Sequence, residues 1–208
     1  MSTVVETKQL KKRFRGPERI TTKIAIETWG HRALLDLYLA LGEVEMISVI
    51  THLGLLAQGL EKLGKAYLIA TQAVRFEHLP IEEAIRWIDR YAKWHNHRLS
   101  DILSSAGIGL PSLRGWLRDP VIEILEGAME EGRYPVPVEK SIFATHGIEA
   151  VWTHRNRDKA LVIANQLVEG MSTAFGVDLM NGGKSPSLKV NAEDWTRFIN
   201  RWNLANRK

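Results

Sequence analysis

The sequence predicts an all-α protein, and three features of the 208-residue chain support that fold class. Apolar residues recur at helical spacing, most clearly over residues 24–41 and 158–175, which is typical of helices that bury one face. Glycines follow several of these stretches, where helices commonly end. Prolines stand where further helices would begin, because a proline in the first helical turn costs no hydrogen bond: Pro80, Pro111 and Pro120.

The composition places the chain among ordinary globular proteins, with 45% hydrophobic and 25% charged residues. The absence of cysteine excludes disulfides and thiolate metal sites and fits a reducing compartment. We find no run of 18 apolar residues and no apolar leader, so we expect no membrane partner and a cytoplasmic location, in the host cell if the protein is virus-encoded. The net charge of +4 is compatible with a nucleic-acid partner.

We expect four segments along the chain. Residues 1–23 form a flexible basic arm, and residues 24–131 a helical domain with two helix-turn-helix-like units, at about 43–66 and 99–118. A linker that contains Pro135 and Pro137 follows at 132–140. Amphipathic helices then make up the C-terminal region, 141–208. Within that region, residues 153–158 are rich in basic and polar groups.

The second unit, at 99–118, reads as two short helices joined by a tight turn. Ser100 is suited to cap the first helix, over 100–106, through its hydroxyl. Gly107 follows the helix, where a left-handed residue is common. We expect Ile108 to return to the core and a second helix to start near Leu110.

The second helix of that unit would bury one stripe and expose a polar, basic face. Its buried positions follow helical spacing: Leu113, Trp116 and Leu117. We expect Ser112 and Arg114 to contact bases or phosphates and Arg118 to contact the backbone of a DNA duplex. A short helix, a glycine turn and a basic second helix suit the DNA major groove. The alternative is a helical hairpin used only for packing.

The first unit, at 43–66, would have a helix that ends at Gly54 and a further helix with an outward polar face. Gln58 is able to contact adenine there, and Lys62 and Lys65 to contact phosphates. Ala57 and Glu61 would share this face, and the Glu61 carboxylate opposes phosphate binding. Plain helical packing is the alternative.

The N-terminal arm carries the densest positive charge of the chain. Lys11, Lys12, Arg13 and Arg15 would follow phosphates or enter a minor groove. The alternative is a solvated tail without a partner.

The run I…G-I…L…W-L-R-D-P, from Ile102 to Pro120, resembles the helix-turn-helix of phage DNA-packaging and transposase-type proteins. The run L-Y-L-A-L-G-E-V, which begins at Leu37, is similar to other modules of that kind. The segment R-x-K-A-L…F-G-V, over 157–177, looks like the helix that follows the DNA-binding part of phage small-terminase proteins. The resemblance implies a homo-oligomeric subunit that recognises double-stranded DNA. A transcriptional regulator and a helical protein-interaction module are the alternatives.

We expect no enzyme activity, cofactor or metal site. His95 and His97 lack the spacing of metal ligands, because two residues that are two positions apart point to different sides of a helix. The Gly-Gly-Lys-Ser run at 182–185 does not complete a phosphate-binding loop. No acid, base and nucleophile form a recognisable catalytic set.

Overall fold

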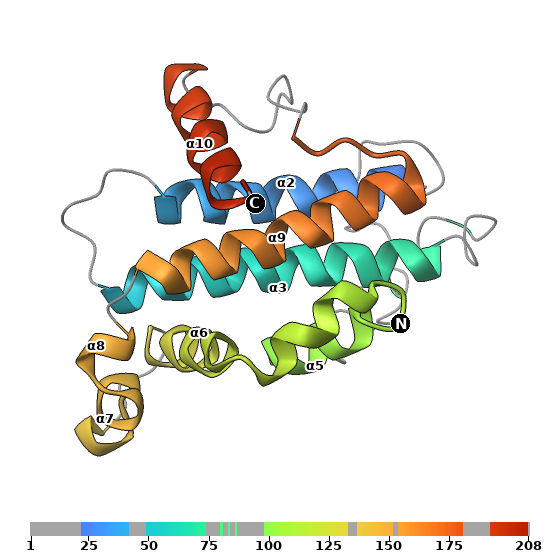
Figure 1. The fold of residues 1–208 in the computed structure, drawn as a ribbon. Helices are drawn as coiled ribbons and strands as arrows, with labels where there is room; N and C mark the ends of the chain where they lie inside the picture. The colour runs from blue at the N-terminus through green and yellow to red at the C-terminus, as the bar shows by residue number, and fades with distance from the viewer. Residues whose placement is uncertain are drawn as a thin grey trace, which may run out of the picture.

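The computed structural model describes residues 22–41, 49–73, 98–132, 137–151, 154–180 and 192–207, together with Pro80, Glu83 and Arg86. These residues contain helices and no strand, which confirms the all-α class (Figure 1). The α-helices are α2 (Thr22–Leu41), α3 (Val49–Ala73), α5 (Leu99–Ala106), α6 (Pro120–Glu131), α7 (Ile142–His146), α8 (Ile148–Val151), α9 (His154–Phe175) and α10 (Ala192–Ala205). Two segments are 3-10 helices, η1 (Pro111–Arg118) and η2 (Val138–Lys140).

Helix α3 is the centre of the described fold. It packs against α2, α5, α6 and α9, and its apolar side chains are almost completely buried on several sides. Figure 1 shows α2, α9 and α3 running alongside one another, with α5 and α6 on the other side of α3 and α10 across α2. A helix surrounded in this way has little surface left for a ligand.

Glycines allow the neighbours of α3 to approach closely. A Cβ atom at Gly59 would lie 2.6 Å from Leu37 Cγ and 3.2 Å from the Ala33 carbonyl oxygen, so α2 packs directly on the backbone there. A Cβ atom at Gly54 would lie 3.2 Å from the Ala128 carbonyl oxygen of α6. These glycines therefore serve helix packing inside one continuous helix.

The first helix-turn-helix-like unit, expected at 43–66, is not formed by the described residues. The prediction that a helix ends at Gly54 is wrong, because α3 runs without interruption from Val49 to Ala73. The periodicity is compatible with either arrangement, since a glycine inside a helix and a glycine after a helix look the same in sequence.

The second unit has the expected ranges but a different local geometry. Helix α5 ends at Ala106 as expected, whereas the second segment is a 3-10 helix. Gly107 has a φ of −62°, so the expected left-handed conformation is wrong. Two backbone bonds of the tighter i to i−3 type close the turn without a left-handed residue, from the Ile108 and Gly109 N–H groups to the Ser105 and Ala106 carbonyls.

Two side chains of this unit also differ from the prediction. Ser100 lies inside α5, and its backbone N–H and Oγ both donate to Glu126 Oε1, at 2.6 and 2.8 Å. The expectation that Ile108 lies in the core is wrong: the side chain is 78% exposed, because the turn aims it away from α3. The carboxylate of α6 therefore takes the capping role expected of Ser100.

Several helix boundaries on the C-terminal side are confirmed. Asp119 caps α6, which begins at Pro120, and Gly176 ends α9 with a φ of +66°. Two short helices, α7 and α8, begin the C-terminal region, and Gly147 separates them with a φ of +80°. Helix α9 begins at His154, one turn before the expected start.

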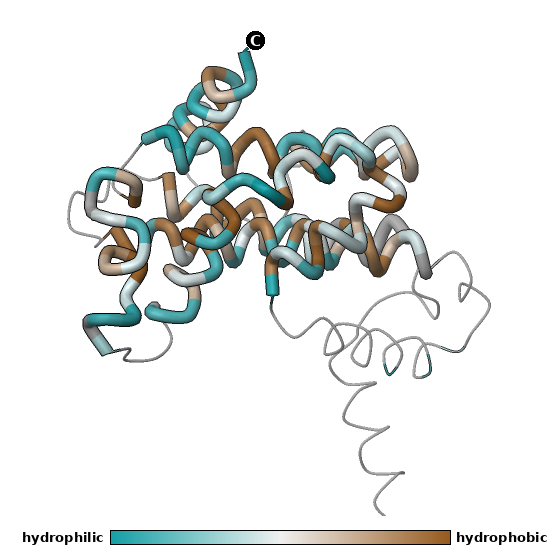
Figure 2. Tube along the Cα trace, turned by 60° about the horizontal axis from the view of Figure 1, so that its bottom comes forward, coloured by the Kyte–Doolittle hydropathy of each residue, from teal (hydrophilic) through white to brown (hydrophobic). Residues whose placement is uncertain are grey.

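The segments before and after residues 132–140 share one hydrophobic core. Helix α9 packs on α3, and α10 contacts α2 and α9 through an aromatic cluster. Figure 2 shows hydrophobic residues recurring along these packed helices. The aromatic cluster between α2 and α10 comprises Tyr38, Trp195, Phe198 and Trp202.

No helix in the described ranges has both the length and the apolar character that a membrane crossing requires.

Candidate nucleic-acid interface

The outward face of η1 carries the three residues of this segment that the sequence predicts to contact DNA. Ser112, Arg114 and Arg118 are exposed, whereas Leu113 is fully buried on the opposite side. Trp116 and Leu117 pack partly buried against the core. We refer to the exposed side chains of Ser112, Arg114 and Arg118 as the η1 face.

Contacts with α9 fix the orientation of η1. Trp116 Nε1 donates to Gln166 Oε1 at 3.0 Å. Leu110, just before η1, packs against Gly170, where a Cβ atom would lie 2.5 Å from Leu110 Cδ2. A polar contact and an apolar contact on two turns of α9 therefore hold the short rod in place and keep the η1 face outward.

Arg114 also closes the turn between α5 and η1. Its Nε donates to the Gly107 carbonyl oxygen at 2.9 Å, beside the C-terminus of α5, where a positive charge is favourable. The four N–H donors on its two Nη atoms lie outside this bond. Arg114 is thus both positioned and able to present a planar group with several donors, the geometry that suits phosphate.

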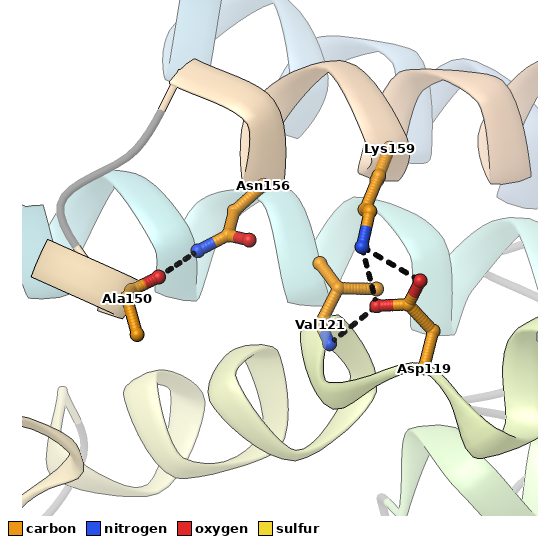
Figure 3. A network of polar contacts seen from close by, with 5 residues as sticks. All are labelled: Asp119, Val121, Ala150, Asn156 and Lys159. Carbon is orange, nitrogen blue, oxygen red and sulfur yellow. Dashed lines mark hydrogen bonds and ion pairs between the residues drawn. The ribbon is translucent and has the colours of Figure 1, made fainter. Parts of the chain in front are cut away.

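The end of η1 is tied to α9 through Asp119 (Figure 3). Asp119 Oδ1 accepts from the Val121 backbone N–H at 3.0 Å, and Lys159 Nζ donates to Oδ1 and Oδ2 at 2.7 and 2.6 Å. Burial raises the pKa of Asp119, but the bonds from Lys159 and Val121 and the charges of Lys159 and Arg155 outweigh it. The pKa therefore lies below its ordinary value.

Further basic groups gather at the start of α9. His154 and Arg155 are exposed there, and Arg157 Nη2 pairs with Asp158 Oδ1 at 3.1 Å. His52 of α3 lies close by: burial, then the charges of Arg157 and His154, lower the pKa of His52. This cluster includes residues that the sequence identified only as a basic and polar stretch, and the contact between α3 and α9 assembles it.

Acidic residues on α6 have structural partners that sequence periodicity did not reveal. Glu126 accepts from Ser100 at the start of α5, and Glu131 Oε1 accepts from the backbone N–H of Ile142 at the start of α7. Glu123 and Glu130 are exposed. The carboxylates of α6 therefore partly serve to satisfy the N-termini of neighbouring helices.

The site residues expected on the first unit do not form an outward face. Lys65 is 4% exposed, and its Nζ lies 2.6 Å from Oε1 of Glu61, which is itself buried. Lys62 pairs with Asp36 of α2, and Gln58 is half-buried. Ala57 is fully buried as well. The expectation that Ala57, Glu61 and Lys65 point outward is therefore wrong, because other helices cover α3 on several sides. This face is therefore not part of the candidate interface.

The remaining expected sites lie outside the described residues. Lys11, Lys12, Arg13 and Arg15 of the arm, His95 and His97, and the run at 182–185 belong to this group. Within the described ranges, no three His, Asp or Glu side chains gather as metal ligands would.

Comparisons with known proteins give no further guidance, because no family model, curated protein or solved structure matches the chain. The case for a nucleic-acid interface therefore depends on the residues of this chain.

Proposed function

We propose that this protein binds double-stranded DNA through the η1 face, as a recognition subunit of the small-terminase type. The observation that carries the proposal is the exposure of Arg114 and Arg118 on a rod whose other side is fixed by Leu113 and Trp116. Both arginines extend from this rod, and Arg114 is also positioned by its bond to the Gly107 carbonyl oxygen. A transcriptional regulator would use the same surface, since a binding site does not distinguish the two roles.

The length of η1 limits the number of base pairs that one copy of the protein can contact. Eight residues of 3-10 helix span about 16 Å at roughly 2 Å per residue. That rod reaches across a major groove about 12 Å wide but covers few base pairs. A homo-oligomer that places several η1 faces on one duplex follows from this limit, because short recognition elements gain specificity by repetition.

A helical protein-interaction module is the second candidate, and Ile108 favours it. This side chain is 78% exposed at the turn before η1, and a partner protein would gain free energy by covering it. Salt separates the candidates, because counterion release makes DNA binding strongly salt-dependent whereas an apolar contact is nearly insensitive.

Fluorescence anisotropy with a labelled duplex of about 30 base pairs tests the proposal. We expect the Arg114→Ala/Arg118→Ala variant to lose at least about tenfold in affinity, which corresponds to about 1.4 kcal/mol. The matched control is Arg197→Ala/Arg207→Ala, which removes two exposed arginines from the α10 region and changes the net charge equally.

Two further results complete the test. Because Arg114 also bonds to Gly107, thermal melting must show that the double variant stays folded, and Arg118→Ala alone provides a variant that leaves this bond intact. Equal affinity of the wild type and both double variants would refute the η1 face as the binding surface.

A further inference from the structure

The carboxylate of Asp119 lies among more positive charge than it neutralises. Lys159 donates to both of its oxygens, and Val121 donates its backbone N–H to Oδ1. Arg118 is the preceding residue, and Arg155 lies one turn before Lys159 on the same side of α9. Figure 3 shows the Lys159 ammonium group directed at Asp119, between η1 and α9. Both oxygens of the Asp119 carboxylate are therefore engaged, in the ion pair with Lys159 and in the cap of α6.

Arg118 and Arg155 supply the positive charge that remains. Both are exposed, and neither forms an ion pair with another residue in the part of the chain that the structure describes. Arg155 is close enough to Asp119 to help lower its pKa. Two arginines from different elements thus flank one neutralised ion pair at the junction of η1 and α9.

The charge at this junction continues along the start of α9. Arg157 and the exposed His154 lie there as well, and Asp158 offsets Arg157 by pairing with it. The surface from Arg118 to His154 therefore carries an excess of positive charge on helical segments, which is the electrostatic character of a phosphate-binding surface.

We propose that Arg118 and Arg155, on either side of the Asp119–Lys159 pair, bind backbone phosphates of duplex DNA and extend its contact from η1 onto α9. The ligand class is the phosphodiester group, which the planar fork of arginine binds through two parallel hydrogen bonds. Lys159 acts as a positioning residue, because it holds the two elements together and is itself engaged with Asp119. This inference rests on the proposed function and assigns it a second contact.

The test compares Arg155→Ala with Arg197→Ala in the full-length chain, by anisotropy with the same duplex over a series of salt concentrations. We expect Arg155→Ala to weaken binding several-fold and to reduce the slope of log K against log salt by about 0.9, the value for one phosphate contact. Arg155→Glu should weaken binding further. Arg197→Ala should change neither quantity, since Arg197 lies on α10 and pairs with Glu193.

The outcomes separate this inference from the proposed function. If the wild type binds and Arg114→Ala/Arg118→Ala weakens binding, but Arg155→Ala does not, the contact on α9 is refuted and the η1 face stands. If the wild type does not bind the duplex, both are refuted. Inorganic phosphate is the second probe, measured by calorimetry: tight phosphate binding that depends on Arg155, without duplex binding, would assign the site to free phosphate and overturn the DNA contact. Thermal melting of Arg155→Ala checks that the variant is folded.

Discussion

The Asp119–Lys159 pair gives the sharpest prediction about stability, because one side chain performs two separable tasks. Asp119 caps α6 through the Val121 N–H group and pairs with Lys159 of α9. Asp119→Asn retains a good capping residue but removes the charge, whereas Asp119→Ala removes both. Lys159→Met removes the ammonium group and keeps most of the aliphatic chain.

The magnitude follows from the geometry. Loss of an N-cap costs about 1 kcal/mol. The ion pair has both side chains roughly one-fifth exposed, at 23% and 21%, and two bonds of 2.7 and 2.6 Å, so we assign it about 1 kcal/mol, the upper end for exposed pairs. We therefore expect unfolding free energies to fall by about 1 kcal/mol for Asp119→Asn and about 2 kcal/mol for Asp119→Ala.

Urea denaturation of the single and double variants measures these contributions as a double-mutant cycle. We expect a coupling of about 1 kcal/mol between Asp119→Asn and Lys159→Met at neutral pH and low salt. Additive effects of the two substitutions would refute the pairing. Equal destabilisation by Asp119→Asn and Asp119→Ala would refute the capping role.

Three other predictions concern side chains that are buried or half-buried. Leu113→Ala should lower the free energy of unfolding by about 2–4 kcal/mol in urea titrations, because Leu113 is fully buried beneath η1; a decrease below about 1 kcal/mol would contradict its anchoring role. Glu61→Leu should lower the free energy of unfolding by about 3 kcal/mol, because it removes the partner of the buried Lys65 ammonium group. The double variant Glu61→Leu/Lys65→Met should recover much of that stability. A double variant no more stable than Glu61→Leu would contradict the pairing. Burial and two nearby basic groups hold the pKa of His52 below 6.5. The unfolded state therefore binds more protons, and stability should decline as the pH falls from above 6.5 through the folded-state pKa. His52→Gln should flatten this decline in thermal melts, and an unchanged pH profile would contradict the assignment.

The sequence was sufficient for the helical class and for boundaries marked by local chemistry. Asp119-Pro120 indicated the start of α6, and Gly176 indicated the end of α9, because caps and left-handed glycines act within a few residues. The outward position of Arg114 and Arg118 also followed from the spacing of their apolar neighbours.

Features that depend on neighbouring helices were beyond sequence periodicity. Gly54 reads as a helix end, yet α6 packs against its backbone inside α3. Lys65 reads as a surface lysine, yet it is buried in an ion pair with Glu61 on a central helix. The cluster around Asp119 needs α9 beside η1, a contact between residues 40 positions apart. In each case, packing between helices determines whether the residue is buried and which neighbour it contacts, and the local sequence pattern does not specify either.

The salt dependence of duplex binding tests the central claim most directly. We predict a steep linear fall of log K with log salt for the wild type. The slope for Arg114→Ala/Arg118→Ala should be shallower by about 1.8, because each of the two phosphate contacts contributes about 0.9. The charge-matched Arg197→Ala/Arg207→Ala variant should retain the wild-type slope. Identical slopes for all three proteins, or no binding by the wild type at low salt, would contradict the assignment of the η1 face to DNA.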